Sequence, residues 1–298
     1  MKTLLMLAAA AVATPAPKPF PAPSEIVATA PAGDWVAIAA SDLLVMDLAN
    51  GKRVVIQLMP PPFSQGWVGN IRKLAAARWW DGTSINRAQD NYVVQWGDAT
   101  EKKALPGGLV TVPEAEYSVL WTPALKPQKS ISITFFDPHQ DAYAFNMSWV
   151  KGWPIASKDL ETVWPVHCYG MVGVGRDMPP NTGTGAELYT VIGHAPRHLD
   201  RNIALVGRVI SGIEHLSSLP RGTGDLGFYK TPEERTEITS VRIGTDVAGL
   251  AAYEYLSTDS ASFAKSADAR ANRRDPFFIV PAGGADICNI PVPVRVAK

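Results

Sequence analysis

The chain has 298 residues with 28 basic and 28 acidic side chains, so it carries no formal net charge. This length fits one large domain or two smaller ones, and a hydrophobic fraction of 46% is typical of a globular protein with a sizeable core. The balanced charge argues against a nucleic-acid-binding protein, which normally carries a basic excess or a basic stripe.

The N-terminal residues have the composition of an export signal followed by a linker. Lys2 precedes an apolar run over residues 4–12 and a small-residue triplet, which predicts a signal peptide over residues 1–13 with cleavage after Ala13. The run is far shorter than the ~20 residues of a membrane span, so no span is expected here or later. The proline-rich residues 14–34 are predicted to be an extended linker. The alternative is a disordered cytosolic tail.

Most predicted elements after this linker are strands. Residues 43–48 and 54–58 flank Asn50-Gly51, a pair typical of a tight hairpin turn. Ser64 is expected to cap a helix that runs to about Arg78. Further strands are predicted at 92–96, 131–136, 143–149, 189–192, 204–209 and 237–243. Shorter helices are predicted at 211–219 and 260–274, with a final extended segment at 289–296. Many strands with few helices indicate a mainly β protein with a closed or nearly closed antiparallel sheet.

One arginine and one glutamine stand among aromatic and apolar residues between positions 79 and 98. Arg87 and Gln95 flank an expected turn at Asp90-Asn91, which would bring both side chains to one face of a small apolar patch. On the residues alone, the ordinary interpretation is that Arg87 pairs with a carboxylate and Gln95 with backbone groups.

The spacing of this segment resembles the signature of the cyclophilin family of peptidyl-prolyl cis-trans isomerases. The matching positions are Asp81-Gly82-Thr83, Arg87, Gln95 and Gly97-Asp98, whereas Ile85, Asn86 and Trp96 depart from the family pattern. A second block, residues 171–189 and 198–212, resembles the family's Gly-Ser-Gln-Phe-Phe and Phe-Gly-Arg-Val segments. The resemblance covers about residues 42–246, with insertions.

The resemblance implies a closed antiparallel eight-stranded β-barrel capped by two helices, assigned here to residues 35–246. Residues from about 113 to 166 exceed what the family needs, and they are predicted to be an inserted hairpin near the active face. Residues 247–298 continue beyond the family's usual last strand and are expected to form a C-terminal extension packed on the barrel.

Cys168 and Cys288 are the two cysteines of the chain. An even count in an exported protein favours a disulfide, which would join the extension to the barrel. The alternative is two buried free thiols. Neither cysteine has a partner at ligand spacing and the five histidines are scattered, so no metal is expected.

The resemblance also implies the reaction, rotation about X–Pro peptide bonds, which needs no cofactor. A catalyst must bind the twisted amide better than either planar form. Arg87 is expected to donate to the prolyl nitrogen of the twisted state, since a guanidinium stays charged. Gln95 is expected to hold the substrate backbone. The proline ring would lie in an apolar pocket made by Tyr92, Val93, Tyr189 and Leu199.

Three positions at the rim of this pocket depart from the family. Glu187 replaces a glutamine, Ile203 a histidine, and His198 the tryptophan of cyclosporin-sensitive members, so weak cyclosporin binding is expected. These changes motivate the alternative of a catalytically weak proline-peptide-binding or scaffold protein of the cell envelope. The isomerase interpretation is preferred because Arg87 and Gln95 are both present. It predicts a monomer in the periplasm that acts on proline-containing polypeptides during the folding of exported proteins.

Overall fold

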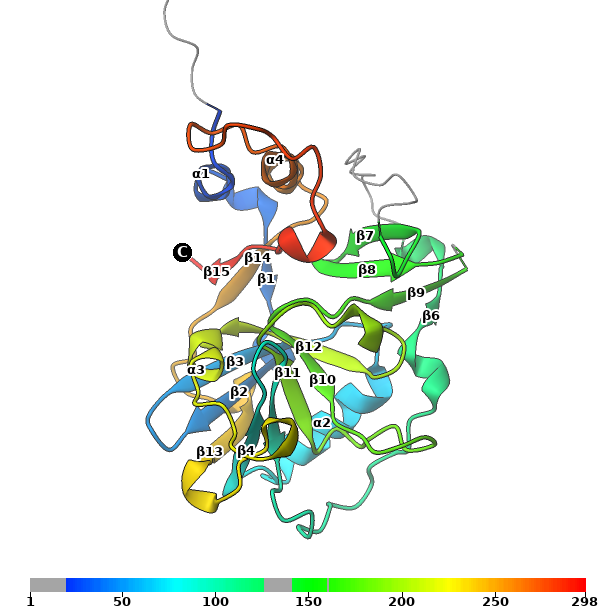
Figure 1. Ribbon diagram of the computed structural model, residues 1–298, viewed down its shortest axis with the longest axis vertical. Helices are drawn as coiled ribbons and strands as arrows, with labels where there is room; N and C mark the ends of the chain where they lie inside the picture. The colour runs from blue at the N-terminus through cyan, green and yellow to red at the C-terminus, as the bar shows by residue number, and fades with distance from the viewer. Residues whose placement is uncertain (1–19, 126–140, 160) are drawn as a thin grey trace, which may run out of the picture.

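Eight strands close into an antiparallel barrel at the centre of the molecule (Figure 1). The computed structural model describes residues 20–125, 141–159 and 161–298. The strands of the barrel are β2 Leu43–Leu48, β3 Arg53–Leu58, β4 Thr83–Ala88, β5 Val93–Gly97, β10 Met171–Val174, β11 Leu188–Val191, β12 Leu205–Ser211 and β13 Thr236–Ile243. Their order around the barrel is β10-β11-β5-β4-β13-β2-β3-β12. The mainly β fold with a closed antiparallel barrel is thus confirmed.

The hairpin β2–β3 forms as predicted, around Asn50 and Gly51. The glycine has a φ of +76°, and the Asn50 side chain accepts a hydrogen bond from the backbone N–H of Lys52 at 3.1 Å. Both strands read as continuous apolar runs because both of their faces are covered. One face lines the main core, and the other packs Val45 and Val55 in a second cluster beneath the chain ends.

Two helices pack on the barrel, α2 Gln65–Ala76 and α3 Ile213–Ser217. Helix α2 buries Trp67, Ile71 and Leu74 completely in the main core. The predicted cap is wrong, because Ser64 has a φ of +54° and its side chain makes no capping hydrogen bond. The side chain of Gln65 braces this end instead, donating to the carbonyls of residues 59 and 63 at 3.1 and 2.7 Å.

The insertion is a four-stranded sheet, larger than the predicted hairpin. Its strands are β6 Val119–Leu120, β7 Asn146–Val150, β8 Trp153–Ser157 and β9 Thr162–Pro165, in the order β6-β9-β8-β7. The expected strand 131–136 and its turn lie outside the described residues. The described partner of β7 is β8, across a tight turn at Lys151-Gly152. The sequence pattern did not predict β8 and β9 because these strands contain Pro154 and Pro165, and proline is unfavourable in sheet interiors.

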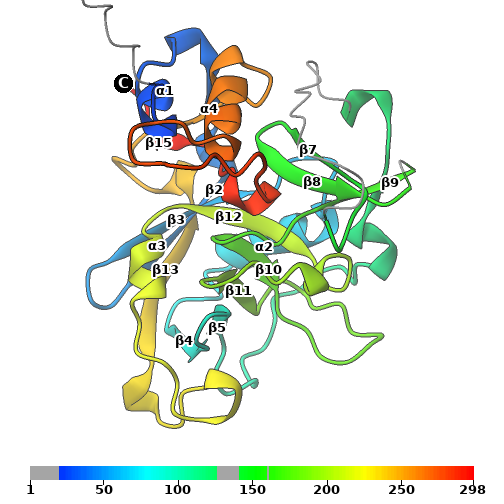
Figure 2. The ribbon, with the colours of Figure 1, turned by 45° about the horizontal axis from the view of Figure 1, so that its top comes forward.

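The N-terminal residues form part of the C-terminal extension, which corrects the predicted extended linker and the boundary at residue 35. Helix α1 Pro23–Ala28 pairs with α4 Ala261–Ala271, and β1 Trp35–Ile38 pairs with β14 Tyr253–Leu256. The edge strand β15 Val294–Val296 completes this sheet (Figures 1 and 2). The proline content predicted a linker, but Pro23 occupies the first turn of α1, where the backbone N–H has no partner within the helix and proline is tolerated. Residues 1–19, which include the expected signal peptide, lie outside the described part.

The extension packs on the barrel and is covalently linked to it. The predicted disulfide Cys168–Cys288 is present, with the two Cα atoms 5.1 Å apart. Phe263 of α4 and Ile287 belong to the same hydrophobic cluster as the barrel interior. Among the described residues, no helix is long and apolar enough to cross a bilayer.

Candidate active site

The hairpin β4–β5 places Arg87 directly opposite Gln95. The two residues are register partners across the strands, and the connecting turn at Asp90 and Asn91 gives Asn91 a φ of +50°. Nη1 of Arg87 donates to Oε1 of Gln95 at 3.3 Å. The side chains that the sequence separates by eight positions therefore form a hydrogen-bonded pair.

Arg87 is oriented by acceptors of the protein itself. Its Nε donates to the carbonyl of Leu226 at 2.7 Å, and its Nη2 donates to the side chain of Gln89. The guanidinium lies over the rings of Tyr92 and Phe228, at 5.7 and 5.2 Å. Burial lowers the pKa of Arg87. A guanidinium has five N–H groups, and these bonds use three of them, which leaves two for a substrate. Leu226 and Phe228 were not foreseen from the sequence.

The expected apolar pocket residues gather beside this arginine. Val93, Tyr189 and Val191 form a buried cluster that is separate from the main core, and Tyr92, Leu199 and Ile203 pack against it. Val191 was not among the predicted pocket residues. The six residues come from β5 and the turn before it, from β11, and from the loop around the short 3-10 helix η5 Arg197–Leu199. His198 stacks on Tyr92 with the ring planes 11° apart. We use the name apolar cluster for Tyr92, Val93, Tyr189, Val191, Leu199 and Ile203.

A polar cavity of about 650 Å³ lies on Arg87, Gln95 and Glu187. Its charged lining comprises Arg87, Asp98, Glu101, Lys103, Arg176, Asp177, Glu187 and Arg235. Burial raises the pKa of Glu187 to about 7, against the opposing effect of hydrogen bonds from the backbone of Asp98 and the side chain of Gln95. No described residue of the insertion lines this cavity.

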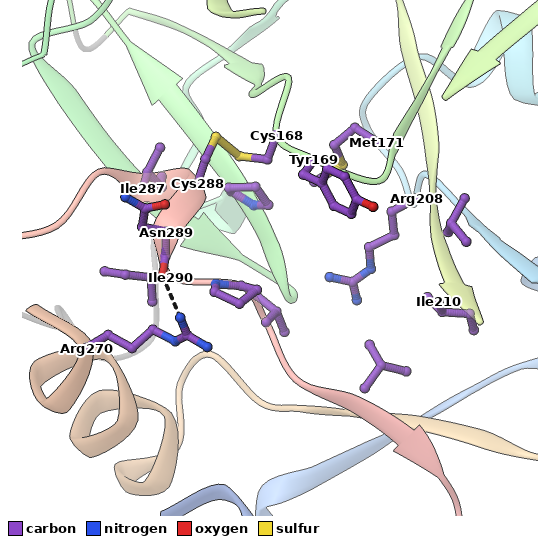
Figure 3. A pocket seen from close by; sticks show the side chains of 15 residues that line it. Cys168, Tyr169, Met171, Arg208, Ile210, Arg270, Ile287, Cys288, Asn289 and Ile290 are labelled. Carbon is purple, nitrogen blue, oxygen red and sulfur yellow. Dashed lines mark hydrogen bonds between the residues drawn. A yellow bond between two sulfur atoms is a disulfide. The ribbon is translucent and has the colours of Figure 1, made fainter. Parts of the chain in front are cut away.

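A second cavity, of about 420 Å³, lies between the barrel strands β10 and β12 and the C-terminal segment (Figure 3). The disulfide borders it, and none of the expected catalytic or substrate-binding residues lines it. The side chain of Arg208 is buried at its wall, where it donates to Gln57 at 2.7 and 2.9 Å and to the carbonyl of Gly152 at 2.7 Å. Burial lowers the pKa of Arg208 to about 10. This arginine joins the insertion to the barrel.

The closed barrel with an arginine–glutamine pair beside an apolar cluster is the arrangement expected of the cyclophilin class of proteins. The sequence matches the family "Cyclophilin type peptidyl-prolyl cis-trans isomerase/CLD" over residues 46–243, more than half of the chain, and the protein belongs to this family. It is a peptidyl-prolyl cis-trans isomerase with a cyclophilin barrel.

Solved structures match this chain at low sequence identity. A cyclophilin from Hirschia baltica is 22% identical with a TM-score of 0.66, and the match covers 89% of this chain and 94% of that one. A cyclophilin-type isomerase of Cryptosporidium parvum, crystallised in the presence of the dipeptide Ala-Pro, is 13% identical with a TM-score of 0.40. That match covers 67% of this chain and 98% of the other. The comparison with curated proteins gave no match.

Proposed function

We propose that the enzyme isomerises X–Pro bonds of exported proteins, with Arg87 as the donor to the twisted amide. The observation that supports these roles is the Arg87–Gln95 pair lying beside the apolar cluster. The pair supplies hydrogen-bond donors, and the cluster supplies a surface that fits a pyrrolidine ring. Catalysis at one prolyl residue needs both the donors and the apolar surface.

The chemistry requires only selective binding of the transition state. Amide resonance sets a barrier of ~18–20 kcal/mol, and rotation makes the prolyl nitrogen pyramidal with a free lone pair. The two remaining N–H groups of Arg87 are the donors for that lone pair. Gln95 accepts from Arg87 and is hydrogen-bonded to Glu187, so its amide is fixed for contact with the substrate backbone. A donor that acts only on the twisted state raises kcat.

The test of this role is the substitution Arg87→Ala in a protease-coupled assay with a proline tetrapeptide. Loss of a preorganised transition-state donor is expected to lower kcat/KM by about 100-fold or more. Arg72→Ala removes an arginine of helix α2 that pairs with Asp42 at the surface, and it serves as the control with unchanged activity. A wild-type rate no better than buffer would instead support the proline-peptide-binding scaffold.

The proposed place of action is the periplasm. The composition of residues 1–13 supports export, and the Cys168–Cys288 disulfide is of a kind that persists in oxidising compartments. Mass spectrometry of the protein from cells that express the full chain is expected to find Thr14 as the first residue, in the osmotic-shock fraction. An intact N-terminus in the cytosolic fraction would contradict export.

A further inference from the structure

A row of buried polar side chains runs behind the apolar cluster. The hydroxyl of Tyr189 lies 2.8 Å from Nε2 of His167, and Nδ1 of His167 lies 2.8 Å from Oδ1 of Asp200. The other oxygen of Asp200 accepts from Nε of Arg197 at 2.8 Å. Nη1 of Arg197 donates to Asp141 at 2.8 Å. The side chains from His167 to Asp141 are each at most 6% exposed, so the row is closed to solvent.

The charge of Asp200 sets the direction of these hydrogen bonds. Burial acts to raise the pKa of Asp200, but the hydrogen bond from His167 and the charge of Arg197 outweigh it, and the pKa lies below its usual value. An ionised carboxylate only accepts, so Nδ1 of His167 donates to Asp200. In the neutral imidazole with its proton on Nδ1, Nε2 keeps a lone pair and accepts from the Tyr189 hydroxyl. The backbone N–H of His167 also donates to Asp200, at 3.0 Å, which fixes the approach of the ring.

These bonds join the two walls of the apolar cluster. Tyr189 lies on β11, whereas Leu199 lies on the η5 loop, directly before Asp200. Asp200 is thus attached to one wall by the chain and to the other wall through His167. The rings of His167 and Tyr189 are 8° from parallel, with their centroids 6.3 Å apart. A phenylalanine would need no such partner, whereas a buried hydroxyl is costly without one.

We propose that His167 and Asp200 are positioning residues, which hold Tyr189 and the Leu199 loop at the separation that fits a proline ring. This inference rests on the proposed function of the apolar cluster as the prolyl pocket. Neither residue is in the cluster itself, so both act through its walls. His167 follows the last strand of the insertion and precedes the disulfide residue Cys168, so the segment that joins the insertion to the barrel supplies the support.

Two substitutions separate positioning from folding. His167→Asn places an amide donor where Nδ1 stands, so it keeps the bond to Asp200 and removes only the acceptor for the hydroxyl. Tyr189→Phe removes the hydroxyl and keeps the ring. Each single variant and the double variant are titrated with a proline tetrapeptide by NMR and assayed for KM and kcat. Each single variant is expected to weaken binding and raise KM by about two- to tenfold, the effect of one hydrogen bond.

The double variant is the decisive sample. If the two side chains act through one shared hydrogen bond, its KM is no higher than that of the worse single variant. Tyr253→Phe makes the same chemical change in the sheet of the chain ends and is expected to leave binding and KM unchanged. Lower melting temperatures with unchanged KM and affinity would overturn the positioning role, as would fully additive effects. A wild-type protein that neither binds nor isomerises the peptide would refute the proposed function itself, and the inference with it.

Discussion

Arg87 is held in place before any substrate arrives. Three of its N–H groups are bound to Leu226, Gln89 and Gln95, and two aromatic rings flank the guanidinium. A donor fixed in this way needs no reorganisation when the amide twists, which is the condition for strong electrostatic stabilisation of a transition state. The loop that carries Leu226 and Phe228 is therefore part of the catalytic apparatus that we propose.

Glu187 gives the site a predicted dependence on pH. Its pKa is raised from 4.5 to about 7 by burial, so the protonated carboxyl favours the folded state. That contribution is fully present below pH 4.5, the unfolded value, and is lost as the pH rises through about 7. Glu187→Gln mimics the protonated form. The variant is expected to match wild type in unfolding free energy at pH 4.5 and to exceed it by about 2–3 kcal/mol at pH 8.

Urea denaturation at the two pH values measures this difference. Glu237→Gln, on the exposed side of β13, is the matched control and is expected to show a difference that does not change with pH. A difference for Glu187→Gln that is equally independent of pH would mean that this carboxyl does not titrate in this range.

At the scale of the elements, the barrel strands β4, β5 and β11 position the site. The strand β5 pairs with β4 on one side and with β11 on the other, so Gln95 has Arg87 and Tyr189 as its two register partners. One residue of the central strand thus lies between the proposed donor and the wall of the proposed pocket. A shift of one register position would turn these side chains to the opposite face of the sheet.

Helix α4 attaches the extension to the insertion through one aromatic contact. Phe263 is 1% exposed and meets Trp149 of β7 edge-on, with ring centroids 5.4 Å apart. Phe263→Ala is expected to lower the unfolding free energy by about 3–5 kcal/mol, because a cavity remains in the core. Phe277→Ala makes the same change at a side chain that is 83% exposed, and a change within about 0.5 kcal/mol is expected. Denaturation curves that show equal losses would contradict this account of the contact.

At the scale of the whole molecule, segments near the two ends of the chain form one layer that packs on the barrel. Helices α1 and α4 lie side by side above a sheet in which β1, near the start of the chain, pairs with β14 near its end (Figure 1). This layer covers the outer face of β2 and β3 through Ile38 and Tyr253. The barrel, the insertion and the chain ends therefore share hydrophobic surfaces and are expected to unfold together.

The disulfide is predicted to stabilise this assembly as a whole. It joins residues separated by 120 positions, and the chain-entropy model gives about 4–5 kcal/mol for a loop of that size. The double variant Cys168→Ser/Cys288→Ser is expected to lose about 2–5 kcal/mol of unfolding free energy in urea. Reducing agent should destabilise wild type by a similar amount and leave the double variant unchanged. Equal stability of oxidised and reduced wild type would argue against this role.

Local patterns in the sequence predicted the parts of the fold that depend on near neighbours. The hairpin at Asn50-Gly51, the helix that buries Trp67 and the turn between Arg87 and Gln95 are all short-range features, and each was found where it was expected. The helical residues 23–28 were missed because the prolines around them were interpreted by composition, without regard to position in the helix.

The sequence by itself determined the barrel class and the family resemblance, and it predicted the disulfide and the presence of Arg87, Gln95 and Tyr189 at the site. Only the tertiary structure decided that Glu187 is partly buried, that Leu226 holds Arg87, and that His167 supports Tyr189. It also decided the pairing of β1 with β14. The reason is physical. Turn and strand preferences act over a few residues, whereas burial, desolvation and long-range pairing depend on which distant segments meet once the barrel has closed.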